Sequence, residues 1–277
     1  MPWLSRLPVY YFINKMEEEK VKAKQENSTT HKNEPVIVIK GLKKSFGKKD
    51  VLKDITLTVN RGENVVILGR SGMGKSVTIQ CIVGLLTPDA GTLKVFGDEV
   101  AEMDEKELKE LRMKVGFLFQ SGALYDSMTV RENLEFPLTR VLKLTDQNEI
   151  DERVNEVLES VGLSDAIDKL PSDLSGGMRK RAGLARTLII RPEIMLYDEP
   201  TTGLDPITSR EISELILNMQ KKYKTSSIII THDMECARIT SDRVLIMDDG
   251  KYIAEGTFDE LHKAKDKIVK SYFIDIS

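Results

Sequence analysis

The stretch VVILGRSGMGKSVTIQCIVGL, residues 65–85, constrains the fold more than any other part of the sequence. Four apolar residues run into Gly69, a short polar loop follows, and an apolar helical pattern begins at Lys75. The loop has the spacing G-x-x-x-x-G-K-[ST] of a phosphate-binding loop between a strand and a helix. The alternative is a glycine-rich turn that only precedes a helix, but the flanking strand and helix patterns favour nucleotide binding.

The residues of this loop are candidate ligands of a nucleotide. Glycines let the backbone wrap a phosphate, and the N–H groups and dipole of the following helix favour negative charge. Lys75 adds a mobile cation for the outer phosphates, and Ser76 offers a hydroxyl to Mg²⁺. The expected contact residues are Gly69, Arg70, Ser71, Gly72, Met73, Gly74, Lys75, Ser76 and Val77.

Strand and helix patterns alternate around this loop. Runs rich in β-branched residues occupy 36–46, 55–59, 65–69, 91–97, 194–199, 227–232 and 243–256. Strands mixed with helical crossovers predict an α/β fold with a largely parallel sheet. Residues 121–181 instead carry helical periodicity with charged faces, so we expect a helical subdomain inserted between the halves of the α/β core.

Composition excludes several classes of protein. The formal net charge is −3 and no long basic run occurs, so the sequence does not indicate a nucleic-acid binder. The longest apolar runs fall well short of the ~20 residues that cross a bilayer. The two cysteines, Cys81 and Cys236, lie far apart among apolar neighbours, which favours packed, reduced thiols in the cytosol.

The ends of the chain differ from the core in composition. The first 14 residues are apolar, but two prolines and the lack of a cleavage site make them a poor signal peptide. The charged segment from Met16 predicts a solvated lead-in, so we expect residues 1–34 to be a flexible extension. The same change favours a translation start at Met16, with residues 1–15 as an artefact. Residues 257–277 form a short tail.

Two more strand ends carry polar residues. IMLYDE ends in Asp198 and Glu199, and strand alternation predicts that one holds Mg²⁺ through water while the other polarises the attacking water. Such a pair often only caps a helix, but the phosphate loop upstream favours catalysis. SIIITH delivers His232 to the edge where ligands bind in open α/β sheets. His31 and His262 are interpreted as structural or surface residues.

A second glycine motif, Ser175, Gly176 and Gly177, precedes a basic helix. It could be another anion site at a helix N-terminus or a simple helix cap. Taken together over residues 36–256, these motifs resemble the ATP-binding subunit of ABC transporters. GRSGMGKS resembles Walker A, LSGGM the signature, IMLYDE Walker B, and GLD, which ends at Asp205, the D-loop.

The resemblance implies further roles. Gln120 matches the Q-loop, His232 the switch histidine, and Phe46 the aromatic residue that stacks on adenine. It implies a P-loop NTPase core over residues 35–256, with an antiparallel β part at its N-terminus. ATP and Mg²⁺ are the implied cofactors, with Ser76, Gln120 and Asp198 as metal ligands and Glu199, His232 and Gln120 as catalytic residues.

The resemblance also implies partners. Two ATP molecules would be enclosed between two copies of the chain, each held by Walker A of one copy and by Ser175, Gly176 and Gly177 of the other, with Asp205 nearby. A multispanning permease would bind this dimer at the cytoplasmic side of the inner or plasma membrane. No nucleic-acid partner is implied.

A finer resemblance is to the ATPase of Mla-type lipid-trafficking systems that work with mammalian-cell-entry (MCE) proteins. It rests on residues 117–138, 174–186 and 205–208 and on the tail, which in that family can reach the neighbouring ATPase. Arg70, Met73 and Val77 depart from the family's usual Walker A residues, although none of them removes a phosphate ligand. The alternatives are an importer of small solutes or amino acids and an ABC-type ATPase acting on nucleic acid or ribosomes.

Overall fold

The computed structural model describes residues 34–273 of the chain. The expectations of a flexible extension and of a start at Met16 concern residues that, apart from Glu34, lie outside this range. One compact unit begins at Pro35. No helix within the described residues has the length and apolarity needed to cross a bilayer.

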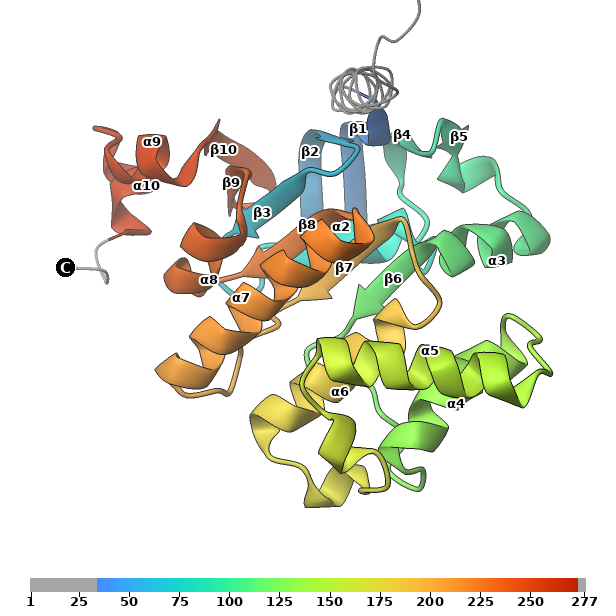
Figure 1. The fold of residues 1–277 in the computed structure, drawn as a ribbon. Coiled ribbons are helices and arrows are strands. Elements are labelled where there is room, and N and C mark those ends of the chain that lie inside the picture. Colours follow the sequence, from blue (N-terminus) through green and yellow to red (C-terminus); the bar gives the residue numbers. More distant parts are fainter. Residues whose placement is uncertain (1–33, 274–277) are drawn as a thin grey trace, which may run out of the picture. The chain divides into compact units, whose positions relative to one another are not determined.

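A ten-stranded sheet runs through this unit, in the order β5-β4-β1-β2-β10-β9-β3-β8-β7-β6 (Figure 1). Its strands are β1 (Pro35–Phe46), β2 (Lys49–Asn60), β3 (Asn64–Leu68), β4 (Ala90–Val95), β5 (Asp98–Glu99), β6 (Val115–Leu118), β7 (Ile194–Asp198), β8 (Ser226–Thr231), β9 (Arg243–Asp248) and β10 (Lys251–Gly256).

The sheet combines a parallel half and an antiparallel half. β6, β7, β8, β3 and β9 pair in parallel, whereas β1, β2, β4 and β5 pair antiparallel, as do β9 and β10. This confirms the predicted α/β fold and its antiparallel N-terminal part. Leu68 of β3 lies opposite Thr231 of β8, so these strands end together. The residues that follow the strands, Gly69 and His232, therefore start at one sheet edge.

The principal helices are α2 (Lys75–Ile82), α3 (Glu105–Lys114), α4 (Val130–Arg140), α5 (Gln147–Ser160), α6 (Gly176–Leu188), α7 (Pro206–Tyr223), α8 (Met234–Thr240), α9 (Phe258–His262) and α10 (Lys267–Ser271). Short 3₁₀ turns occupy Val100–Glu102, Ser164–Ala166 and Pro171–Asp173.

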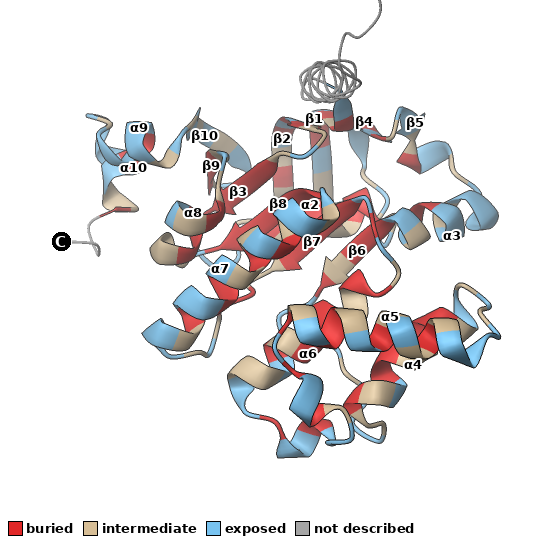
Figure 2. Cartoon of the chain, in the orientation of Figure 1, coloured by how far each residue is buried: buried red, intermediate tan, exposed pale blue. Residues whose placement is uncertain are grey.

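β3 is buried on both faces, as expected of a central parallel strand (Figure 2). Its alternate residues join different cores because strand side chains point to opposite faces. Ile67 packs in one core with Ile79 of α2, and Val66 packs in the other with Ile216 of α7. The phosphate loop thus leaves a strand that is fixed from both sides.

A third core lies among α4, α5 and α6, which group together in Figure 1. It includes Leu134 of α4, Val154 of α5 and Ala182 of α6, all fully buried. α6 also sends Leu184 and Leu188 into a core of the sheet. This helix is therefore shared by the helical subdomain and the α/β core, and the predicted boundary at residue 181 falls inside it.

The described part of the tail packs on its own chain. Leu261 of α9, Val269 of α10 and Phe273 are buried in the same core as α7. His262 lies beside the rings of Phe258 and Phe273, with centroid distances of 6.3 and 5.6 Å. A tail contact with a neighbouring ATPase therefore stays a prediction.

Both cysteines are buried and free, as the sequence predicted. Burial raises the pKa of Cys81 to about 11 and that of Cys236 to about 12. Their thiols therefore stay protonated near neutral pH, which makes them poor nucleophiles.

Candidate nucleotide-binding site

The phosphate loop runs from the end of β3 to the first turn of α2, and its geometry requires glycine. A Cβ on Gly69 would lie 2.7 Å from the carbonyl oxygen of Met247. Gly74 has φ of +99°, and a Cβ there would lie 2.8 Å from Leu52 Cδ2. No side chain caps α2, so its first N–H groups remain available to an anion.

The loop borders a cavity of about 370 Å³. Most of the predicted site residues meet in this cavity, although they come from distant parts of the sequence. Its lining consists of Val51, Ser71, Gly72, Met73, Gly74, Lys75, Ser76, Val77, Gln120, Asp198, Glu199, Thr202 and His232.

Lys75 holds its ammonium inside this cavity. Nζ donates to the carbonyl oxygens of Gly69 at 2.5 Å and Arg70 at 3.1 Å, and lies 3.6 Å from Glu199 Oε1. Burial lowers the pKa of Lys75, while Glu199 and Asp198 act in the opposite direction. Phosphate oxygens entering the cavity would offer this cation new anionic partners.

Ser76 and Asp198 form an oxygen pair across the cavity, because Ser76 Oγ donates to Asp198 Oδ1 at 3.0 Å. A hydroxyl and a carboxylate suit Mg²⁺, which prefers oxygen ligands and usually keeps several waters. Residues 34–273 contain no group of three or more His, Cys, Asp or Glu side chains arranged to hold a metal. The pair therefore fits an ion whose other ligands come from phosphate and water.

Replacing Asp198 with asparagine is expected to raise the melting temperature of the nucleotide-free protein at pH 8. Burial raises the pKa of Asp198, against the effect of its hydrogen bond from Ser76. The protonated carboxyl is thus favoured on folding, and wild-type stability is lost as pH rises through this raised pKa. The gain in melting temperature should vanish below the ordinary carboxyl pKa near 4. Thermal melts of both proteins between about pH 4 and pH 8 measure this difference.

Asp89→Asn is the matched control with the opposite sign. Hydrogen bonds from Lys44 and from the amide of Ser45 lower the pKa of Asp89. Its carboxylate therefore stabilises the fold at high pH, and the variant should melt lower than wild type at pH 8. A lower melting temperature of Asp198→Asn than of wild type at pH 8 would contradict the prediction. The Mg²⁺-dependent ATP hydrolysis of Asp198→Asn should fall.

Glu199 lies just beyond β7 in a left-handed conformation, with φ of +51°. Its Oε2 accepts from Thr202 Oγ1 at 3.3 Å and lies 2.8 Å from His232 Nδ1. The carboxylate is 14% exposed, whereas the His232 side chain is 57% exposed. Asp198 and Glu199 thus have separate partners, because the chain turns sharply between them.

The signature residues lie elsewhere on the chain. Ser175 caps α6, and its Oγ accepts from Met178 N at 3.3 Å, while Asp205 caps α7. Neither residue lines the phosphate cavity. Ser175 and Gly177 instead line a second cavity. A Cβ on Gly177 would lie 2.6 Å from Thr208 Cγ2, so the α6 start packs closely on α7.

Arg70 and Phe46 are predicted ligands that do not line the phosphate cavity. Arg70 contributes its carbonyl oxygen to Lys75, and its guanidinium lies 5.8 Å from the Tyr272 ring centroid. Phe46 ends β1 and is 47% exposed. Val51, five residues further along the chain, lines the cavity. The exposed ring is thus near enough in sequence to the cavity to be tested as the base-stacking residue.

Phe46→Ala is expected to weaken ATP binding by about five- to 150-fold, since a base–aromatic stack contributes about 1–3 kcal/mol. The maximal rate of hydrolysis should change little because Phe46 lies outside the phosphate cavity. Titration calorimetry with ATP measures the loss. Phe46→Trp should retain affinity, and unchanged affinity in Phe46→Ala would assign the stacking to another residue.

Sequence reasoning missed three residues: Val51, Thr202 and Lys180. Val51 and Thr202 line the cavity, and Lys180 Nζ donates to the carbonyl oxygen of Gln120. Thr202 could have been suggested by its place three residues after Glu199. Lys180 looked like one of several surface cations of a basic helix.

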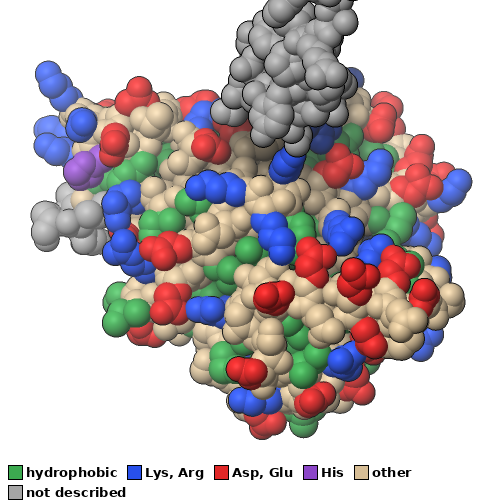
Figure 3. Space-filling view, viewed as in Figure 1, with side chains coloured by type: hydrophobic (Ala, Val, Ile, Leu, Met, Phe, Trp, Pro, Cys, Tyr) green, Lys and Arg blue, Asp and Glu red, His purple; other side chains and the backbone are tan. Residues whose placement is uncertain are grey.

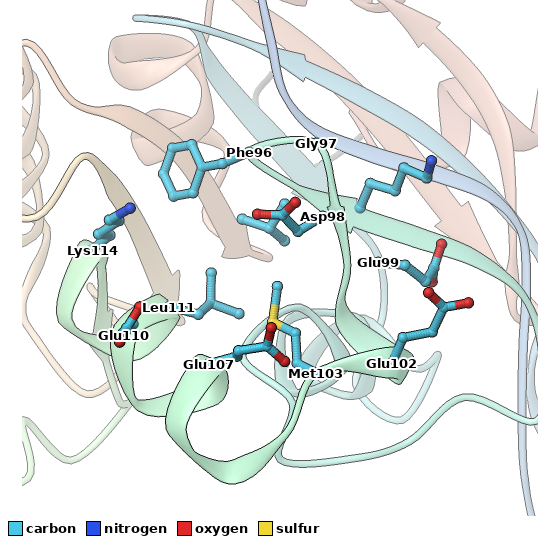
Figure 4. A pocket seen from close by; sticks show the side chains of 12 residues that line it. Phe96, Gly97, Asp98, Glu99, Glu102, Met103, Glu107, Glu110, Leu111 and Lys114 are labelled. Atoms are coloured by element: carbon cyan, nitrogen blue, oxygen red, sulfur yellow. The ribbon is translucent and has the colours of Figure 1, made fainter.

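A larger cavity, of about 530 Å³, lies between the β4–β5 hairpin and α3 (Figure 4). Leu111 and Met103 contribute apolar surface, and the carboxylates of Glu102, Glu107 and Glu110 also face this region. It contains none of the predicted site residues. Its mainly acidic lining would repel a triphosphate. We therefore do not assign it as the nucleotide site, although it is larger than the phosphate cavity.

Residues 52–202 match the ABC transporter family. The chain therefore belongs to this family, and it is an ABC-type ATPase. The probable ribonucleotide transport ATP-binding protein mkl of Mycobacterium leprae is 39% identical over 236 residues, which are 85% of this chain and 68% of that protein. The methionine import ATP-binding protein MetN of Rhizobium johnstonii is 40% identical over 224 residues, 81% of this chain and 61% of that protein.

Solved structures share the fold. cbiO1 of Clostridium perfringens, part of the ABC transporter complex cbiONQ, aligns with a TM-score of 0.78 and 30% identity, covering 87% of this chain and 96% of that one. The ATP-binding cassette MJ0796, a dimer bound to ADP and Pi, aligns with a TM-score of 0.73 and 31% identity. The alignment covers 80% of this chain and 98% of that one.

Proposed function

We propose that this chain is the ATP-hydrolysing subunit of a membrane transporter and that two copies close around two ATP molecules. One observation carries the proposal: the phosphate loop lines one cavity of the chain, and the signature residues Ser175 and Gly177 line another. A signature that contacts ATP must then come from a second copy. The dimeric state of MJ0796 supports this arrangement.

In the proposed mechanism, Lys75 acts first and Glu199 acts after it. In the nucleotide-free chain, Lys75 lies 3.6 Å from Glu199. Phosphate oxygens would draw the ammonium away and leave the Glu199 carboxylate to accept a proton from the attacking water. His232 Nδ1, 2.8 Å from Oε2, would keep this carboxylate oriented, and Gln120 would contact nucleotide or water from the cavity wall. When bound at Ser76 and Asp198, Mg²⁺ would neutralise phosphate charge.

The proposed partner is a multispanning permease, with the ATPase dimer on the cytoplasmic side of the inner or plasma membrane. We favour lipid traffic of the Mla type, with an MCE protein as a further partner, because three internal stretches and the tail resemble that family. MetN supports the alternative of a small-solute importer, and the name of mkl points to ribonucleotides. The chain spans 61–68% of the length of these relatives.

Nucleic acid is the least favoured partner. Acidic and basic side chains are interspersed on the face shown in Figure 3, and the net charge is −3. A phosphate-backbone binder usually gathers basic residues on one face.

Affinity purification of the chain from detergent-solubilised native membranes tests the proposal. We expect a multispanning permease, and an MCE protein with bound phospholipid supports the lipid assignment. A soluble solute receptor in its place would support the importer. Recovery of ribosomes or DNA without any membrane protein would refute both.

A further inference from the structure

Lys180 is a buried cation for which the proposed chemistry has no role. It belongs to α6 and is 7% exposed. Its Nζ donates to the carbonyl oxygen of Gln120 and to that of Glu199, the latter at 3.4 Å. Gln120 follows β6 and Glu199 follows β7, so one ammonium joins α6 to two segments of the cavity wall.

This burial is unfavourable for the charge itself. Burial lowers the pKa of Lys180, and Glu199 and Asp198 offset that effect only in part. Replacing a complete buried ion pair by apolar side chains is often neutral or stabilising, but removing Lys180 alone would take this donor from the carbonyl oxygens of Gln120 and Glu199. These hydrogen bonds offset the cost of burying the charge, so stability alone gives a weak reason for a lysine here.

The backbone that Lys180 contacts is unusual. Glu199 has φ of +51°, a conformation that side-chain-bearing residues rarely adopt and that needs support from its surroundings. Its N–H donates to the carbonyl oxygen of Ile230, and its own carbonyl oxygen accepts from Lys180. Both polar groups of this residue's backbone are thus tethered, one to β8 and one to α6.

We propose that Lys180 is a positioning residue that sets the Glu199 carboxylate and the Gln120 loop relative to α6. Because Ser175, Gly176 and Gly177 stand at the start of α6, a shift of this helix would reach Glu199 of the same chain through Lys180. ATP bound at the signature by the partner copy would thereby influence hydrolysis in this chain's own cavity. The inference rests on the proposed role of Glu199 as base.

The test variant is Lys180→Met, which removes the hydrogen-bond donor. The conservative variant is Lys180→Arg, which keeps the positive charge and can donate to both carbonyl oxygens. Arg112→Met is the matched control, because Arg112 also donates to two carbonyl oxygens, those of Val83 and Gly84 at 2.9 and 3.0 Å, but lies outside the cavity lining. For each purified variant, kcat, KM, ATP affinity and melting temperature are measured.

We expect Lys180→Met to lower kcat about ten- to a hundred-fold, because displacement of a catalytic group by about 1 Å has effects of this size. ATP affinity should stay within about threefold, since phosphate ligands are untouched. The melting temperature should change little, because relief of the buried charge offsets the hydrogen bonds lost to Gln120 and Glu199. Lys180→Arg should restore most of kcat. Arg112→Met should keep kcat.

Unchanged kcat in Lys180→Met would overturn the inference. A parallel fall in kcat and melting temperature in Lys180→Met would also overturn it, because that pattern is typical of a structural residue. A folded Lys180→Arg that is no more active than Lys180→Met would overturn it as well. Glu199→Gln separates the two proposals. Normal hydrolysis by that variant refutes the base assignment itself, whereas an inactive Glu199→Gln beside a normal Lys180→Met refutes only the role of Lys180.

Discussion

Glu199→Gln should hydrolyse ATP about 10²- to 10⁴-fold more slowly than wild type while still binding ATP. Glutamine keeps the shape of the side chain and can still contact His232 and Thr202, but it cannot accept a proton from water. It also removes the negative charge that lies 3.6 Å from Lys75 Nζ, so ATP affinity should be unchanged or higher. Phosphate release and equilibrium ATP binding separate these two effects.

Glu193→Gln is the matched control for this substitution. Glu193 directly precedes β7, at the opposite end from Glu199, and pairs with Arg61 at 3.0 Å. Surface ion pairs contribute about 0–1 kcal/mol, so this variant should hydrolyse ATP at the wild-type rate. Near-normal turnover by Glu199→Gln would show that another group activates the water.

Two inactive variants, Lys75→Met and Ser175→Asp, should recover activity when their copies are mixed. Lys75→Met removes the cation from the phosphate cavity. Ser175→Asp keeps an equally good helix cap but places a negative charge where the partner's triphosphate is proposed to lie. A mixed dimer has one intact composite site, so random mixing should restore up to about a quarter of wild-type turnover.

The mixture of Lys75→Met with Glu199→Gln controls for recovery by other means. Both substitutions lie in the same half of the composite site, so no mixed dimer contains an intact site and turnover should stay at the background rate. If Lys75→Met and Ser175→Asp also failed to complement, with mixed dimers demonstrated by cross-linking, each site would have to be complete within one chain. That result would remove the basis of the proposed dimer.

The phosphate loop was readable from the sequence because its chemistry depends on local spacing. Gly74 and Lys75 must follow a strand and open a helix, and that order is visible without a structure. Parallel strand ends gather at one edge, which made the convergence of Glu199 and His232 predictable. The left-handed conformation of Glu199, whose carboxylate has other hydrogen-bond partners than that of Asp198, was not predictable from strand alternation.

Long-range packing hid the remaining features. Lys180 is one of several basic residues near the start of α6, and the carbonyl oxygens to which it donates come from segments 60 and 19 residues away in sequence, so its burial was not predictable. The packing of the tail was even less predictable from the sequence. Nothing local in IVKSYF predicts that Phe273 joins the core formed with α7.

The protected state of Cys81 and Cys236 makes the chain suited to spectroscopy. With both native thiols buried and protonated, a cysteine introduced at an exposed position such as Ile207, which is 74% exposed, would be modified selectively by a thiol-reactive dye. Energy transfer between dyes on two copies could then follow association in real time on an otherwise native sequence.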